Sequence, residues 1–154
     1  MKRLIVDVSS VVKRCLFAGQ DPENGYEVEH EGKTVKVNSH HYGIDNTINS
    51  MVACMETLNA TPSQMILVVE SGQSKARRQM IYKGYKNNGK ASAPAVMEEY
   101  GKARDAVVEM FRKLGATVVT QPNIEADDVI AFLVERLKGE KVIFSEDGDM
   151  ATLL

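Results

Sequence analysis

Four short apolar runs alternate along the chain with longer amphipathic stretches, and this alternation constrains the fold more than any other feature of the sequence. The runs lie at residues 4–8, 64–70, 116–120 and 141–145. Their length and apolar content are typical of buried strands. Strands separated by helices require crossover connections, which bring the strands together in parallel. The sequence therefore predicts an α/β fold, with a parallel central sheet and helices on both faces.

The stretches between these runs carry signals for helices. Asn38 and Ser39 are capping residues before a helix predicted over about 41–58, whose apolar residues form one stripe. Pro94 begins a second long helix. A third is predicted at 124–138, and another begins in the sequence EDGDMATLL. Helical segments therefore separate or follow most of the predicted strands.

Residues 26–38 follow a different pattern. Apolar side chains alternate with polar ones on both sides of a Glu-Gly-Lys turn. Alternation with a period of two is typical of a strand with one solvated face. We therefore expect a small hairpin insertion at 26–38.

Length and composition limit the class of protein. The 154 residues, 44% hydrophobic and 26% charged, fit one globular domain. No apolar run approaches the length that spans a bilayer, so we expect no membrane partner. Cys15 and Cys54 lie among apolar neighbours, which favours reduced thiols and a cytoplasmic protein. His40 and His41 have no cysteine at zinc-site spacing, which argues against zinc.

Carboxylates lie at or just beyond the end of each predicted strand. One is near the end of the first strand, one ends the second, three follow the third and two follow the fourth. They are Asp7, Glu70, Glu125, Asp127, Asp128, Asp147 and Asp149. Because the carboxyl ends of parallel strands meet at one edge of the sheet, we expect all seven acids at that edge.

Each of these acids, taken alone, has a structural explanation. Acids at 125–128 suit the start of a helix, where the macrodipole favours negative charge. The sequence EDGDM suits a turn with Gly148 at the bend. Asp7 fits a buried acid bonded to backbone amides. These explanations do not account for three acids within four residues, which repel one another unless a cation is present.

Oxygen ligands without histidine or cysteine suit Mg²⁺ or Mn²⁺. Seven carboxylates exceed what one ion ordinarily takes, which predicts two ions roughly 4 Å apart, as in phosphoryl-transfer sites. The chain shows no Ser/His/Asp or Cys/His set and no glycine-rich phosphate loop before a helix. Metal-assisted hydrolysis of a phosphodiester is therefore the reaction class that we favour.

A basic stretch complements the acids. Residues 71–97 contain six cations and no acid, whereas residues 121–154 contain eight acids and three cations. Cations neutralise phosphates, and aromatic rings stack on bases. The candidate nucleic-acid contacts are Lys75, Arg77, Arg78, Tyr82, Lys83, Tyr85, Lys86 and Lys90. The alternative is an ordinary solvated surface loop.

The segments LIVDVSS, ILVVE, RRQMIYKGYKNNGK, IEADDVIA and SEDGDMATLL, in this order, resemble the phage and bacterial 5′-nuclease family. These are the flap endonuclease and 5′→3′ exonuclease enzymes of the PIN-like superfamily. The resemblance covers nearly the whole chain and is closest to the bacteriophage branch. It implies metal-binding roles for all seven acids. It also implies that Arg78, Tyr85 and Lys86 belong to an arch that admits a 5′ single strand, with Lys86 and Arg78 as catalytic candidates and Tyr85 stacking on a base.

The chain departs from the family pattern in several places. Glu70 stands where the family usually has Asp, and Val8 replaces the usual Gly. Asn88, Gly89 and Lys90 stand where an Arg usually follows the Tyr-Lys pair. The hairpin has no clear counterpart. The chain also stops before the family's helix–hairpin–helix-like duplex-binding element, which carries further metal-binding acids.

We therefore expect residues 1–154 to be a PIN-like 5′-nuclease domain without that C-terminal part, which a missing segment or a second chain would supply. The expected activity is divalent-metal-dependent hydrolysis of DNA or RNA near a 5′ end by a two-metal mechanism. The expected partner is DNA with a 5′-ended single strand or flap, with RNA as the alternative, in the host cytoplasm if a phage encodes the protein. Two other readings stay open: a compact PIN-type endoribonuclease, and an inactive fragment that binds nucleic acid or a partner.

Overall fold

A four-stranded parallel sheet forms the centre of the molecule. The computed structural model describes residues 1–73, 76–84 and 92–153. The sheet has the strand order β5-β4-β1-β6, and each neighbouring pair is parallel. The predicted α/β class is therefore confirmed. The strands are β1 (Arg3–Asp7), β4 (Met65–Val68), β5 (Thr117–Val119) and β6 (Lys141–Phe144).

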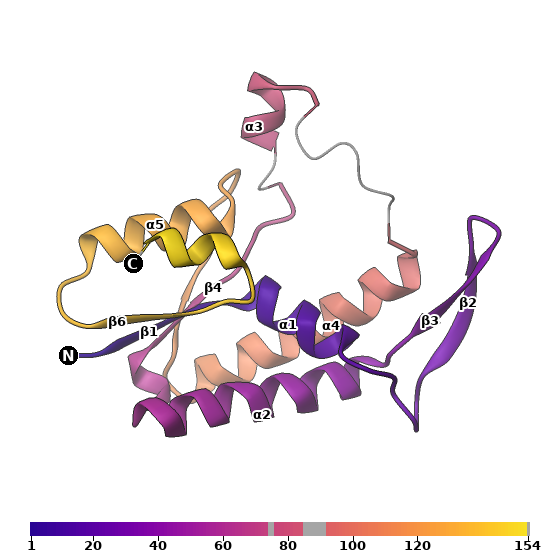
Figure 1. Ribbon diagram of the computed structural model, residues 1–154, viewed down its shortest axis with the longest axis horizontal. Coiled ribbons are helices and arrows are strands. Elements are labelled where there is room, and N and C mark those ends of the chain that lie inside the picture. The colour runs from indigo at the N-terminus through magenta and orange to yellow at the C-terminus, as the bar shows by residue number, and fades with distance from the viewer. Residues whose placement is uncertain (74–75, 85–91, 154) are drawn as a thin grey trace.

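Helices cover both faces of this sheet, as predicted (Figure 1). One face carries α1 (Val8–Phe17), α2 (His40–Leu58) and α4 (Pro94–Lys113). The other carries α5 (Ala126–Arg136) and the short 3₁₀ helix η2 (Gly148–Leu153). A further 3₁₀ turn, η1 (Pro62–Gln64), leads into β4.

Alternation of side chains along β1 explains the two layers. Leu4 and Val6 belong to the core shared with α1, α2 and α4, and Ile5 belongs to the core beneath α5. All three are fully buried. Full burial of such a side chain contributes about 1.5–3 kcal/mol to folding. On the first face, Gly43 allows α2 to pack closely against α1. A Cβ at this position would lie only 2.9 Å from Leu16 Cδ1 of α1.

Helix α1 was not predicted from the sequence. It begins at Val8, directly after β1, so the residue that was expected to end the strand is the first residue of the helix. The helix start is marked by Asp7, whose Oδ1 accepts a hydrogen bond from the Ser10 backbone N–H at 3.1 Å. This spacing of three residues is a capping pattern. Asp7 is therefore fixed at the junction of the two elements.

The two longest helices begin where the sequence predicts. Ser39 caps α2 by accepting a hydrogen bond from the Tyr42 backbone N–H at 3.3 Å. Pro94 occupies the first turn of α4. Strand β4 is shorter than predicted, since it ends at Val68, and Glu70 therefore lies beyond the strand and not at its last position.

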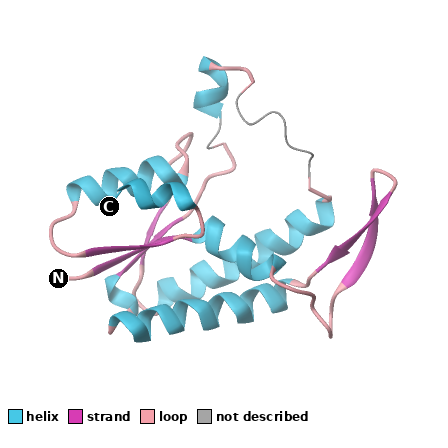
Figure 2. Cartoon of the chain, viewed as in Figure 1, coloured by secondary structure: helices cyan, strands magenta, loops and turns pink. Residues whose placement is uncertain are grey.

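The predicted hairpin is present as a separate two-stranded sheet (Figure 2). It consists of β2 (Tyr26–His30) and β3 (Lys33–Val37), which are antiparallel. Glu31 and Gly32 at the turn have φ of 50° and 72°, as a tight two-residue turn requires. Val37 packs against the start of α4 in a small apolar cluster of its own.

Helix α3 (Ala76–Ile81) stands away from the body of the molecule (Figure 1). Met80 and Ile81 on this helix are 86% and 83% exposed. Within the described ranges, no helix is long and apolar enough to cross a membrane.

The topology places a ligand site at one edge of the sheet. The chain runs outward from β1 to β4 and β5, and then α5 carries it back to β6 on the other side of β1. Ligands in open parallel sheets bind beyond the carboxyl ends of the strands, at the point where the strand order reverses. In this sheet that point lies between β1 and β6.

Candidate active site

A small cavity of about 150 Å³ opens at the carboxyl edge of the sheet. Its walls carry five of the seven acids singled out from the sequence, which lie at or beyond the ends of all four strands of the central sheet. The five are Asp7, Glu70, Glu125, Asp127 and Asp147. We call this space the acid cavity. Ser9, Ser10 and Lys13, which the sequence analysis did not select, also line it from the start of α1.

Asp7 is the most constrained of these acids. It is 4% exposed, and its Oδ2 accepts a hydrogen bond from Ser145 Oγ at 2.9 Å. Burial raises the pKa of Asp7, the hydrogen bonds from Ser10 and Ser145 oppose that rise, and the charges of Glu70 and Asp147 add to it. A bound cation would favour the ionised form that burial disfavours.

The loop after β6 is tied to the start of α1. Ser10 Oγ accepts a hydrogen bond from the Glu146 backbone N–H at 2.9 Å. Ser145 Oγ accepts one from the Asp147 backbone N–H at 3.1 Å. Arg14 also forms an ion pair with Glu146. These contacts hold Asp147 beside Asp7, although the two are far apart in the sequence.

Glu125 faces a cation from α3. It is the N-cap of α5, is 2% exposed, and its Oε2 lies 2.8 Å from Arg78 Nη1. Arg78 Nη2 also donates a hydrogen bond to Asp128 Oδ1 at 2.7 Å. Asp128 lies outside the lining of the acid cavity, as does Asp149, whose backbone N–H donates to Asp147 Oδ1 at 3.0 Å.

The donor set of the acid cavity fits a hard, hydrated cation. Among the described residues, no three Asp, Glu, His or Cys side chains lie close enough together to hold an ion directly. Mg²⁺ usually keeps several of its waters and takes one or two carboxylates from the protein. The cavity volume of about 150 Å³ has room for an ion with water, since one water takes roughly 30 Å³.

The basic stretch is only partly described. Arg77 and Arg78 lie in α3, and Tyr82 and Lys83 follow it, with Tyr82 67% exposed. The remaining predicted contacts, Lys75, Tyr85, Lys86 and Lys90, fall outside the described residues. The ion pair of Arg78 with Glu125 places α3 beside the acid cavity.

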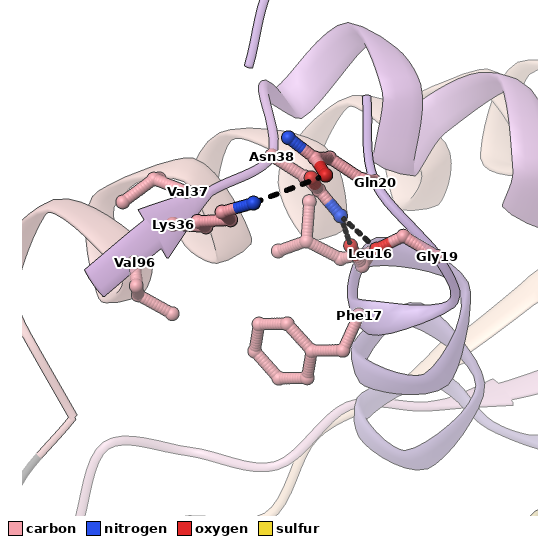
Figure 3. A pocket seen from close by; sticks show the side chains of 8 residues that line it. All are labelled: Leu16, Phe17, Gly19, Gln20, Lys36, Val37, Asn38 and Val96. Atoms are coloured by element: carbon pink, nitrogen blue, oxygen red, sulfur yellow. Dashed lines mark hydrogen bonds between the residues drawn. The ribbon is translucent and has the colours of Figure 1, made fainter. Parts of the chain in front are cut away.

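A separate cavity of about 350 Å³ lies between the end of α1, β3 and the start of α4 (Figure 3). Phe17 and Val96 face this space, and no acid lines it. Asn38 Nδ2 donates hydrogen bonds to the Leu16 and Gly19 carbonyls at 2.7 and 3.2 Å, which fixes the path of the chain. The residues that line this cavity therefore offer no carboxylate to a metal ion.

Comparison with protein families gives one match over residues 2–154. The matching family is described as the 5′-3′ exonuclease, N-terminal resolvase-like domain. The match covers every acid of the cavity and the whole basic stretch.

Two curated relatives are similar over part of the chain. A 5′-3′ exonuclease of Aquifex aeolicus (strain VF5) is 37% identical over 95 residues, which cover 59% of this chain and 31% of the relative. A 5′-3′ exonuclease of Buchnera aphidicola subsp. Acyrthosiphon pisum (strain APS) is 33% identical over 92 residues, covering 58% and 31%. The matched region is therefore about a third of each relative's length.

Solved structures share the fold. The 5′-exonuclease of bacteriophage T5 with zinc bound has a TM-score of 0.62 and 19% identity, covering 100% of this chain and 52% of that one. The T5 flap endonuclease in a pseudo-enzyme-product complex with DNA and metal ions has a TM-score of 0.59 and 18% identity, with the same coverage. This chain thus spans about half of the T5 protein.

Proposed function

This chain belongs to the family of N-terminal, resolvase-like domains of 5′-3′ exonucleases, and we propose that it carries the hydrolytic site of a divalent-metal-dependent 5′ nuclease. The substrate is DNA with a 5′-ended single strand or flap. Two divalent ions, Mg²⁺ or Mn²⁺, are the proposed cofactors.

The observation that supports this proposal most strongly is the gathering of five carboxylates around the acid cavity. Four strands of the sheet contribute to it, so the crowding is a property of the fold and not of one helix start. Like charges in a partly buried space destabilise the folded state unless a cation compensates them. Metal ions bound in a hydrolytic site would compensate this repulsion.

We assign the acids of the cavity to the ions, with Asp128 and Asp149 bordering them. Bound Mg²⁺ or Mn²⁺ would lower the pKa of a water and neutralise charge on the phosphate. Ser10 and Ser145 hold the Asp7 carboxylate from two sides and so orient it toward the ions. Such supporting hydrogen bonds commonly tune the affinity of a metal site.

Delivery of the strand is assigned to α3 and the residues around it. Arg78 lies within ion-pair distance of the acid cavity wall, and Tyr82 and Lys83 follow on the same exposed segment. We assign the phosphate contacts to Arg78 and Lys86 and base stacking to Tyr82 and Tyr85. The T5 flap endonuclease, which shares the fold, has been solved with DNA and metal ions.

The duplex-binding part is proposed to lie outside this sequence. The relatives are about twice to three times as long as the matched region. A further segment of the same protein or a second chain would hold the duplex, while residues 1–154 cut the strand. The chain alone is then expected to cleave single-stranded and flap DNA at reduced affinity.

The test is cleavage of a 5′-labelled flap DNA with Mn²⁺ or with EDTA. Short 5′ products should form only with metal, and Asp127→Ala and Asp147→Ala should abolish them. Asp45→Ala, an exposed acid of α2 outside the cavity, is the matched control and should cleave normally. Products that persist in EDTA, or that survive both cavity substitutions, would rule out the metal site. An RNA strand of the same sequence tests the endoribonuclease alternative.

A further inference from the structure

A second hollow of about 240 Å³ shares a wall with the acid cavity. Ser9, Lys13 and Glu70 line both spaces. The far side of the second hollow differs in character, because Tyr100 and Arg104 of α4 line it in place of further acids. We call this space the basic hollow.

Two cations flank one aromatic ring in the basic hollow. Lys13 Nζ lies 5.3 Å from the centre of the Tyr100 ring, and Arg104 Cζ lies 5.7 Å from it. Arg104 Nε and Nη2 also bond to Asp105 Oδ1, at 2.8 and 2.7 Å. Asp105 is 71% exposed, so that pair is worth at most about 1 kcal/mol. Arginine has five N–H donors, so Arg104 keeps donors for a further ligand.

Two buried hydroxyls line the same hollow. Within the described residues, Ser9 Oγ and Ser71 Oγ are buried and make no hydrogen bond of acceptable geometry. Ser9 is 6% exposed. An unsatisfied buried hydroxyl costs about 1–3 kcal/mol, so two around one hollow indicate that a ligand or water completes them.

Tyr100 links these groups. Burial raises the pKa of its phenol, and the neighbouring Ser9 hydroxyl and Arg104 guanidinium oppose that rise. Ser9 and Lys13 of α1 therefore line the hollow together with Tyr100 and Arg104 of α4.

We infer that the basic hollow binds a phosphate group of the nucleic-acid strand directly beside the acid cavity, a role that rests on the proposed nuclease function. Two cations and two donor hydroxyls match the charge and the oxygens of a phosphate. Arg104, which lines this hollow and not the acid cavity, disfavours a metal ion there. The shared wall of Ser9, Lys13 and Glu70 places this phosphate next to the one that is cut. It is either an internal phosphodiester or a 5′-terminal phosphate.

The test measures affinity without chemistry. Single-stranded oligonucleotides of one sequence, with a 5′-phosphate or a 5′-hydroxyl, are titrated in EDTA by fluorescence anisotropy. Lys13→Ala and Arg104→Ala should each weaken binding about tenfold. Each should also flatten the dependence of log K on log salt by about 0.7. Arg112→Ala, on α4 but outside the hollow, should change the affinity little beyond the general loss of one charge.

The two oligonucleotides separate the sources of the phosphate. A loss confined to the 5′-phosphorylated strand identifies a terminal phosphate, and an equal loss for both strands identifies an internal one. If Lys13→Ala and Arg104→Ala bind both strands as Arg112→Ala does, the inference is overturned.

Ser9→Ala keeps the test valid if the charge variants are unstable. Removal of an unsatisfied hydroxyl should leave the melting temperature unchanged or raise it, while weakening oligonucleotide binding in EDTA about threefold. Unchanged binding by a folded Ser9→Ala variant would count against the phosphate site.

Failure of this inference can be distinguished from failure of the proposed nuclease function. If the wild-type chain cleaves with metal but these variants bind normally, the inference fails alone. If the variants lose binding but the wild-type chain never cleaves, the nuclease function fails.

Discussion

Arg78 Nη1 lies 2.8 Å from Glu125 Oε2, so a cation of α3 is paired with a buried carboxylate of the acid cavity. A buried carboxylate without a partner is costly, and this one is 2% exposed. The same guanidinium also holds Asp128 at the start of α5. Arg78 therefore acts as an internal counter-ion for the cavity while no divalent ion is bound. It links the position of α3 to the charge of the site.

This pairing predicts competition between Arg78 and divalent ions. Arg78→Ala removes a positive charge beside the cavity, so Mn²⁺ should bind about tenfold more tightly in calorimetric titration. Arg112→Ala removes the same charge from a distant part of α4 and should leave the metal affinity unchanged. Weaker metal binding by Arg78→Ala would mean that Arg78 organises the acids and does not compete for them.

The repulsion among the carboxylates predicts an effect on stability. Asp147→Asn keeps an oxygen that can accept the bond from the Asp149 N–H but removes one negative charge. Relief of a repulsion of about 1 kcal/mol should raise the metal-free melting temperature by about 2–4 °C. The same variant should lose the rise in melting temperature that millimolar Mn²⁺ gives the wild-type protein.

Asp128→Asn is the contrasting variant for that experiment. Asp128 is paired with Arg78 and lies outside the cavity lining, so its neutralisation removes an attraction. Its metal-free melting temperature should stay the same or fall, and its response to Mn²⁺ should persist. If both variants respond alike, the cavity described here is not the metal site.

Asp21 predicts a dependence of stability on pH away from the candidate site. Hydrogen bonds from the backbone of Asn24 and from Ser39 lower the pKa of Asp21 to about 2, from 3.8. The folded state therefore gains stability from ionised Asp21 above pH 3.8, and this gain is lost as the pH falls toward 2. Asp21→Asn should unfold at lower urea concentration than wild type at pH 7, and the difference should shrink between pH 4 and pH 2.

The control for this prediction is Asp45→Asn, which changes an exposed acid on α2. It should show little difference from wild type at either pH. Asp21 joins the entry of the hairpin to the cap of α2, because its Oδ2 accepts hydrogen bonds from both the Oγ and the backbone N–H of Ser39. If the difference in unfolding urea concentration between Asp21→Asn and wild type stays constant down to pH 2, the charge of Asp21 does not contribute to stability.

The sheet, the hairpin and the gathering of acids follow from local patterns in the sequence. The apolar runs are short and the acids come just after them, so the parallel-sheet rule alone places Asp7 near Asp147. Helix α1 was missed because it follows β1 with no connecting loop, so Val8 was counted with the strand. The lining residues Ser9, Ser10 and Lys13, which it contributes, were missed with it.

The partners of the individual acids could not be predicted from sequence. Glu125 and Asp128 are three residues apart on one helix, yet only Glu125 lines the acid cavity. The pairing of both with Arg78 depends on where α3 stands relative to α5, which no local spacing encodes. The basic hollow likewise depends on the packing of α1 against α4, two helices that are distant in the sequence.

The hydrogen bonds of Ser145 predict an effect of this side chain on the metal affinity of the acid cavity. Its Oγ donates to Asp7 Oδ2 at 2.9 Å and accepts from the Asp147 backbone N–H at 3.1 Å, so one hydroxyl positions two of the proposed ligands. Ser145→Ala removes both contacts without changing the charge of the cavity. Loss of such supporting bonds typically weakens metal affinity by about 10–100-fold. We expect a loss in this range for Mn²⁺ by calorimetric titration, with oligonucleotide binding in EDTA unchanged.

Thr57→Ala, which removes an exposed hydroxyl from α2, serves as the control and should change neither quantity. If Ser145→Ala binds Mn²⁺ as tightly as wild type, Asp7 and Asp147 are positioned by the backbone alone, and the support assigned to Ser145 is wrong.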